Sequence, residues 1–227
     1  MAERQQPIVL AIETSGDACG VAVSGTQIQY AAQFDGRYLH DRFLAELAYR
    51  ALRDIDIAPE QVDAVAVSAG PGSFTGLRIG AAFAKGFCLI PPPVLIAIPT
   101  AEAIAFAAQE LTQWFPETPI VVLLPSHRNK VYAQEFRFAP TPAIGSIELL
   151  DSTEAQQRYD TPDFIVVGPG ASLCPAAKTV SLFHRLDVRF IAHRALAYWE
   201  EQRFTDPATF VPLYGQDFIP GQSQKSR

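Results

Sequence analysis

Cysteine, lysine and long apolar runs are all scarce in this 227-residue sequence, and each scarcity excludes a class of protein. The three cysteines are far apart and form no C-x-x-C pair, so we expect neither a disulfide framework nor a zinc site. No apolar stretch reaches the roughly 18–20 residues that a membrane-spanning helix needs. The first residues are polar and charged, unlike a signal peptide. We therefore expect a soluble, cytoplasmic protein with no membrane contact.

Clustered basic residues, which a nucleic-acid-binding protein needs for phosphate contacts, are missing as well. The formal net charge is −6, and the only four lysines are scattered along the chain. If the protein serves a nucleic-acid pathway, we expect a partner to provide most of the basic surface.

The usual catalytic motifs are also absent. A glycine-rich loop continues as Gly76-Leu77-Arg78, where a Walker A loop would have Gly-Lys-Ser/Thr. Ser73 lacks the flanking glycines of a G-x-S-x-G hydrolase elbow, which argues against a peptidase. The four histidines form no H-x-x-x-H or H-x-E pattern. We predict no catalytic residue and no metal site.

What the sequence does have is apolar patterning, with 48% hydrophobic residues. In the first half this patterning predicts three strands, a helix, a strand, a helix, a strand and a helix. This is the order of a ribonuclease H-like half-domain, the unit that actin-like ATPases duplicate. The expected strands are 8–12, 19–24, 27–34, 62–68 and 94–98, and the expected helices are 37–54, 74–89 and a third that starts at 99–100.

The second half predicts a smaller and degenerate α/β unit, so the fold class is an actin-like ATPase (ribonuclease H-like) fold with two α/β subdomains. We expect strands at 120–124, 130–138, 144–150 and 164–167, and a helix from about Ser152. The expected domains are 1–114, then 115–189, with a C-terminal helix at about 190–205 that packs back on the first domain and a tail at 206–227.

Two loops rich in small and hydroxyl residues are candidates for a phosphate or nucleotide site. In the first, Glu13 would hold magnesium through water while Thr14 and Ser15 contact phosphate, or these residues simply close a turn. The second follows a strand and opens a helix, where backbone N–H groups bind anions. Alternatively, Ser73 or Thr75 caps the helix. The candidate residues are Glu13, Thr14, Ser15, Gly70, Gly72, Ser73 and Thr75.

A stripe of small residues runs along the helix 74–89, at Gly76, Gly80, Ala84 and Cys88. A glycine inside a helix costs about 1 kcal/mol relative to alanine, so we expect a second helix to approach this stripe too closely for a Cβ. That neighbour belongs either to the same chain or to another subunit. The helix 37–54 has an apolar arc wide enough to bury more than one side.

Three segments, 8–15, 70–80 and 98–100, resemble the TsaB (YeaZ-type) family. The resemblance implies an actin-like fold without its own catalytic metal site, and a role as partner of a TsaD-like catalytic subunit, with a TsaE-like accessory ATPase. That complex transfers a threonylcarbamoyl group to the adenosine next to the anticodon of tRNA. The chain is then expected to have no cofactor of its own. ATP or ADP and magnesium would bind to the assembled complex, and the chain would contact tRNA only as part of that complex.

The resemblance also implies where the partner binds, because the family pairs through a four-helix bundle. The two helices involved correspond to about 37–54 and 74–89. An exposed apolar helix pair would also favour a homodimer when the chain is alone. The implied interface residues are Leu39, His40, Phe43, Leu44, Leu47, Gly76, Leu77, Gly80, Phe83, Ala84 and Phe87.

The sequence departs from the family pattern at three places. Ser126-His127-Arg128 stands where the family usually has Asp-Ala-Arg, Tyr214-Gly215-Gln216 where it tends to have Tyr-Leu-Arg, and Glu13 where Asp is common. These changes bear on any nucleotide or tRNA role of the second domain and leave the pairing helices untouched.

The competing function is an ATP-dependent small-molecule kinase or ATPase of the same fold. It would use Glu13 near magnesium and Ser73 and Thr75 at phosphate. Against it, the second half shows no Asp-Gly phosphate loop, and Gly168-Pro169-Gly170 is its only glycine cluster of this kind.

Overall fold

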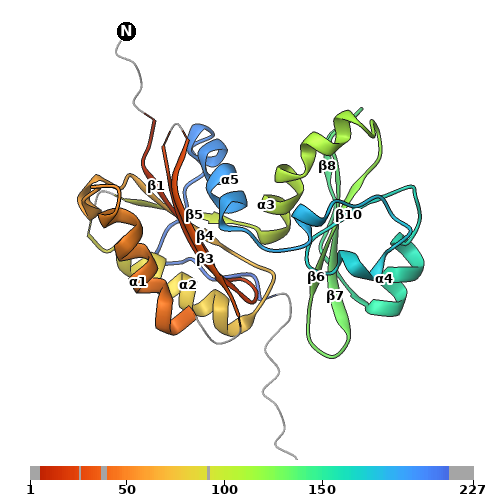
Figure 1. Ribbon diagram of the computed structural model, residues 1–227, viewed down its shortest axis with the longest axis horizontal. Coiled ribbons are helices and arrows are strands. Elements are labelled where there is room, and N and C mark those ends of the chain that lie inside the picture. Colours follow the sequence, from red (N-terminus) through yellow and green to blue (C-terminus); the bar gives the residue numbers. More distant parts are fainter. Residues whose placement is uncertain (1–5, 26, 37–39, 91–92, 215–227) are drawn as a thin grey trace, which may run out of the picture.

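The computed structural model describes residues 6–25, 27–36, 40–90 and 93–214, which form two sheets connected by helix α3 (Figure 1). Leu39 and the end of the chain from Gly215, including Gln216, lie outside the described residues. Within the described part, no helix combines the length and the apolar composition needed to cross a membrane.

The first sheet has the strand order β3-β2-β1-β4-β5. Strand β1 pairs antiparallel with β2 and parallel with β4, and β5 continues in parallel. This is the ribonuclease H-like topology of actin-like ATPases, so the predicted fold class is confirmed. The strands are β1 (Val9–Glu13), β2 (Ala18–Ser24), β3 (Ile28–Asp35), β4 (Ala64–Ser68) and β5 (Val94–Ile98).

Helices cover both faces of this sheet, because successive strand residues point to opposite sides. Leu10 and Ile12 face the helices α1 (His40–Arg53) and α2 (Phe74–Phe87). Val9 and Ala11 face the helix α5 (Val188–Glu200), which lies on the opposite side. The central strand β1 is fully buried, as its uninterrupted apolar run predicts.

The second sheet has the order β10-β6-β7-β8, with β9 paired to β7. The predicted strand 144–150 is wrong, because it splits into two short strands. The chain bends at Gly145, whose N–H donates to the Glu135 carbonyl at 2.8 Å. The elements are β6 (Ile120–Pro125), β7 (Lys130–Arg137), β8 (Ala143–Ile144), β9 (Glu148–Asp151), α4 (Ser152–Tyr159) and β10 (Ile165–Val167). Short 3-10 helices are Pro59–Gln61, Gln109–Gln113, Ala171–Leu173 and Ser181–Phe183.

Helix α3 (Thr100–Ala107) contributes to the cores of both sheets. Ala103 packs with the α5 side of the first sheet, and Ile104 packs with the second. The Arg194 Nε of α5 donates to Glu102 Oε1 of α3 at 2.8 Å, and both side chains are almost fully buried. This ion pair joins α3 to α5.

Candidate functional site

A cavity of about 800 Å³ lies between the two sheets. Strands β1, β4, β6 and β10 end toward it, and the carboxyl ends of parallel strands are where α/β folds usually bind ligands. Its volume is within the range of small-molecule sites. The lining residues are Ser15, Gly16, Asp17, Ala18, Asp35, Pro71, Gly72, Ser73, Phe74, Leu124, Pro125, Ser126, His127, Tyr132, Pro169, His184, Arg185, Leu186 and Tyr214.

Glu13 is absent from that lining, although the sequence places it in the phosphate loop. Its side chain is 1% exposed, and its Oε1 accepts hydrogen bonds from the Ser15 backbone N–H at 2.5 Å and the Ser15 hydroxyl at 2.6 Å. Burial raises the pKa of Glu13 to about 7. Of the two interpretations of this turn, the structure favours the structural one, because the Glu13 carboxylate organises the turn from within the protein.

Thr14 is also turned away from the cavity. It is fully buried, and its hydroxyl has no hydrogen-bond partner within the described part of the chain. A Cβ placed on Gly80 would clash with that hydroxyl. Thr14 therefore contacts helix α2 and cannot contact a phosphate in the cavity.

The glycine loop before α2 is locked to the same turn. The Ser73 N–H donates to the Ser15 carbonyl at 2.6 Å, and a Cβ on Gly72 would clash with that carbonyl. The Ser73 hydroxyl accepts from the Gly76 N–H at 3.3 Å, so it caps α2. Gly70 has a φ of +94°, which favours glycine, and lies against Leu213. Of the candidate phosphate residues, only Ser15, Gly72 and Ser73 line the cavity; Thr75 is exposed beside it.

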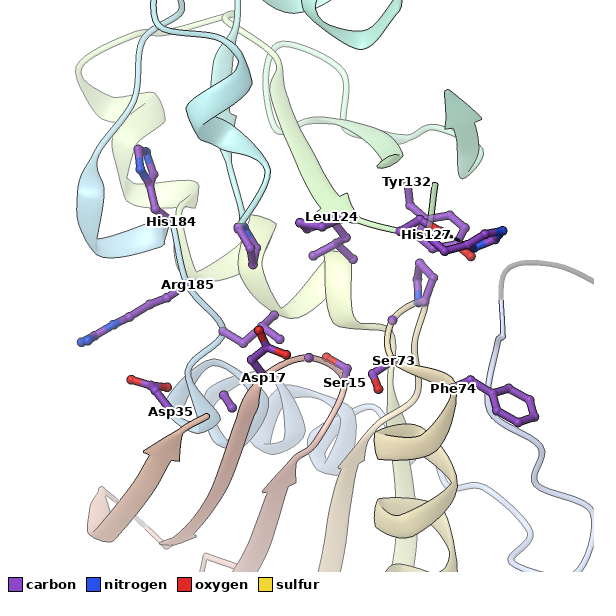
Figure 2. Close-up of a pocket in the computed structure, with 18 of the residues that line it drawn as sticks. Ser15, Asp17, Asp35, Ser73, Phe74, Leu124, His127, Tyr132, His184 and Arg185 are labelled. Carbon is purple, nitrogen blue, oxygen red and sulfur yellow. Dashed lines mark hydrogen bonds between the residues drawn. The ribbon is translucent and has the colours of Figure 1, made fainter. Parts of the chain in front are cut away.

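Sequence reasoning missed most of the cavity wall, because that wall comes from segments far apart in the chain. Asp35 and Arg185 lie at one end in Figure 2, whereas His127 and Phe74 lie at the other. The rings of Phe74 and Tyr214 are 4.8 Å apart, and Tyr132 Oη donates to the Tyr214 carbonyl at 3.3 Å. No local sequence pattern connects these residues, since only the fold brings them together.

The described residues contain no cluster of three or more His, Cys, Asp or Glu side chains that could hold a metal ion. Of the charged groups at the Asp35 end, Arg185 lies 4.0 Å from the carboxylate of Asp187, a buried residue outside the lining. Asp187 forms an ion pair with Arg189, and this pair holds the pKa of Asp187 below its usual value despite its burial. The cavity is a cleft whose lining combines apolar and aromatic side chains with the charged side chains of Asp17, Asp35 and Arg185.

The small-residue stripe of α2 faces the protein's own sheet. A Cβ at Gly76 would clash with the Thr14 carbonyl, one at Gly80 with the Thr14 hydroxyl, and Ala84 is fully buried. The prediction that a partner's helix covers this stripe is wrong, because the turn after β1 already fills the space. The implied interface residues that are buried within the chain are His40, Leu44, Leu47, Gly76, Leu77, Gly80 and Ala84.

An apolar surface nevertheless remains on the outside of α1 and α2, which lie next to each other on one face of the first sheet (Figure 1). Three of the implied interface residues are half-buried there, and Ile79 is similarly placed. Phe34, 47% exposed, lies with its ring 5.3 Å from that of Phe43. We call this surface the outer face; its apolar residues are Phe34, Phe43, Ile79, Phe83 and Phe87.

Comparison with known proteins identifies the family. The profile of the family described as TsaD: tRNA N6-adenosine threonylcarbamoyltransferase matches residues 25–166. The tRNA threonylcarbamoyladenosine biosynthesis protein TsaB of Haemophilus influenzae is 34% identical over 132 residues, 56% of this chain and 53% of that protein. The chain belongs to the family that this profile describes, and within it the chain is a TsaB (YeaZ-type) protein. The resemblance seen in the sequence is thereby confirmed.

A second curated relative and a solved structure are also similar to this chain. TsaB of Buchnera aphidicola subsp. Schizaphis graminum is 29% identical, over 57% of this chain and 60% of that protein. The structure of YeaZ from Pseudomonas aeruginosa has a TM-score of 0.72 at 22% identity and covers 91% of this chain and 99% of that one, so the fold is shared. The sequence matches span only about half the length of these curated relatives.

Proposed function

We propose that this chain is a non-catalytic partner subunit that binds and activates a TsaD-like threonylcarbamoyltransferase. The reaction served is the formation of N6-threonylcarbamoyladenosine next to the anticodon of tRNA. Family membership supports the pathway, since the relatives carry that biosynthetic name. The observation that carries the subunit role is the outer face of α1 and α2.

The outer face has the features of a protein-binding surface. Its aromatic side chains are half-exposed and form two ring pairs, Phe34–Phe43 with centroids 5.3 Å apart and Phe83–Phe87 with centroids 6.1 Å apart. Aromatic residues are enriched at the centres of interfaces, where they provide large contact areas at a small entropic cost. Beyond Phe87, Leu89 and Ile90 are 80% and 77% exposed and extend the apolar surface. Contiguous exposed apolar surface of this kind usually binds a partner.

The absence of catalysis by the chain itself is supported by the cleft. Glu13 and Thr14, the two residues best suited to magnesium and phosphate, are committed to internal contacts. We accordingly place ATP or ADP and magnesium at the level of the complex, together with a TsaE-like ATPase. Because the chain is acidic, we propose that tRNA contacts it only through the complex.

Co-elution in size-exclusion chromatography with the TsaD-like subunit of the same genome tests the pairing. Phe83→Glu and Phe43→Glu should abolish the complex while circular dichroism stays unchanged, because a charge in a desolvated aromatic centre costs several kcal/mol. Trp114→Glu, at a 79% exposed apolar side chain outside the outer face, is the matched control and should bind normally. Normal binding by both phenylalanine variants would contradict the proposal.

Gly80→Leu is unsuitable as an interface variant. Because the space at Gly80 is filled by Thr14, a large side chain there would displace the turn beside the cleft and destabilise the protein by about 1–3 kcal/mol.

The alternative function, an ATP-dependent kinase or ATPase, is favoured only by the size of the cleft. Calorimetry with Mg-ATP on the isolated chain distinguishes the two. We expect no micromolar binding and no turnover. Micromolar binding accompanied by ATP hydrolysis would favour the alternative.

We further propose that the chain forms a homodimer through the outer face when the partner is missing. Sedimentation should show dimers for the wild-type protein and monomers for Phe83→Glu. Dimers that persist in this variant would place the contact elsewhere.

A further inference from the structure

The charge on the two pairing helices differs in sign from that of the whole chain. Helices α1 and α2 together carry five basic and two acidic side chains, a net charge of +3, whereas the chain has a net charge of −6. The basic residues are Arg42, Arg50, Arg53, Arg78 and Lys85. The helices that carry the outer face are therefore a basic region of an otherwise acidic protein, and we call Arg42 and Arg78, which are next to Phe43 and Ile79 in the sequence, its basic rim.

Three of these cations form no ion pair within the described part of the chain, and two of the three, Arg42 and Arg78, are exposed. In contrast, Arg50 binds Glu46 and Arg53 binds Asp54. The charges of Arg42 and Arg78 are thus available to a binding partner.

Each of these two guanidinium groups is held over an aromatic ring of its own helix. The Arg42 Cζ is 4.9 Å from the Phe43 ring centroid, and the Arg78 Cζ is 5.0 Å from that of Phe74. A cation over an aromatic face is attracted by the ring quadrupole. This contact restricts the long side chain before binding, so a carboxylate that pairs with it orders fewer rotamers.

We infer that the partner surface is acidic: carboxylates of the TsaD-like subunit pair with Arg42 and Arg78, around an apolar centre that contacts Phe43, Phe83 and Phe87. This inference rests on the proposed function and adds the chemistry of the surface that the outer face binds. An RNA backbone is the other anionic candidate. It is disfavoured by the half-exposed phenylalanines, which need an apolar surface.

Charged groups at an interface rim act mainly on the association rate, and salt screens them. We therefore measure binding kinetics with the TsaD-like subunit immobilised, at about 0.05 M and about 0.5 M NaCl. Arg42→Glu and Arg78→Glu are each compared with Arg137→Glu, an exposed arginine on β7 of the second sheet that makes the same charge change. Each rim variant should lower the association rate constant by about 3–10-fold at low salt, and the loss should shrink at high salt. Arg137→Glu should change it less than about twofold.

The outcomes separate this inference from the proposal it rests on. If the wild-type chain does not bind the TsaD-like subunit at all, the subunit role fails and the inference fails with it. If the wild-type chain binds and the rim variants behave like Arg137→Glu, the subunit role stands and the acidic partner surface is refuted. Faster association of the rim variants would indicate a basic partner surface, which also refutes it. Fluorescence anisotropy with tRNA is the last measurement. If the isolated chain binds tRNA, and Arg78→Glu abolishes this binding without changing the kinetics of binding to the TsaD-like subunit, the rim binds RNA and the inference is refuted.

Discussion

The carbonyl oxygen of Thr14 lies directly against Gly76 of helix α2. A Cβ at Gly76 would come closer than 3.0 Å to that oxygen and 3.2 Å from the carbonyl carbon. Because the obstacle is backbone in the buried turn after β1, it cannot rotate away as a side chain would. The glycine therefore sets how closely α2 approaches the first sheet, and with it the position of Ser73 at the cleft.

Gly76→Ala should consequently destabilise the protein by about 1–3 kcal/mol, the usual cost of overpacking a well-packed contact. Gly86→Ala on the same helix is the matched control, since nothing lies within 4 Å of its added Cβ. That change should stabilise the protein by about 0.5–1 kcal/mol through helix propensity. Urea unfolding of the three proteins measures both effects. Equal stability of the two variants would contradict the packing described for α2.

Glu13 should make stability depend on pH. Burial raises the pKa of Glu13 from its ordinary value of 4.5, which we take for the unfolded chain, to about 7 in the folded protein. Between these values the folded state binds more protons than the unfolded state, so stability falls as pH rises from about 4.5 to 7. The expected loss is ~3 kcal/mol at pH 8 relative to pH 4.

Glu13→Gln isolates this contribution, because an amide oxygen can still accept from the Ser15 N–H and does not ionise. The stability of the variant relative to the wild type should rise between about pH 4.5 and 7, as judged from urea unfolding at a series of pH values. The contributions of the other titrating groups cancel in the difference between the unfolding free energies of the two proteins. A difference that stays constant with pH would show that Glu13 ionises normally.

The Glu102–Arg194 ion pair should contribute strongly to the attachment of α3 to α5. Arg194→Leu removes the nearer of the two cations at the buried Glu102 carboxylate and leaves Arg203 at 4.0 Å. Removal of one partner of a buried ion pair costs about 3–5 kcal/mol. The second change Glu102→Leu should recover part of that loss. Arg50→Leu, which breaks the exposed Glu46–Arg50 pair, should cost no more than about 1 kcal/mol. Thermal unfolding of the wild type and these three variants is the measurement, and similar losses for the two single arginine variants would argue against a buried ion pair at α3.

The element order of the first half could be predicted from the sequence because each strand there is a buried apolar run and each helix has an apolar periodicity. The strand near 144–150 could not, since its break depends on where Gly145 meets Glu135 on a neighbouring strand. The start of α5 was predicted more closely. The helix begins at Val188, near the expected start, because Asp187 caps it by accepting from the Arg189 N–H at 2.9 Å. The domain bounds stay a prediction.

The candidate site was harder to predict than the fold. The glycine spacing shows that another segment approaches α2 closely. It does not show whether that segment belongs to the same chain or to a partner, because both would require the same glycines. Only the structure shows that Thr14 occupies that space. The sequence names Phe43, Phe83 and Phe87 as interface residues. It does not show that these half-exposed side chains lie on a different side of the helices from the buried glycine stripe. The contribution of Tyr214 and Arg185 to the cleft depends on long-range folding and has no signal in the sequence.

Hydrogen–deuterium exchange of the chain, alone and bound to the TsaD-like subunit, tests the central claim most directly. The account predicts that binding slows exchange in peptides covering α1 and α2, and that α4 and β7 to β9 exchange at unchanged rates. Protection confined to the second sheet or to the cleft, with α1 and α2 unaffected, would contradict it.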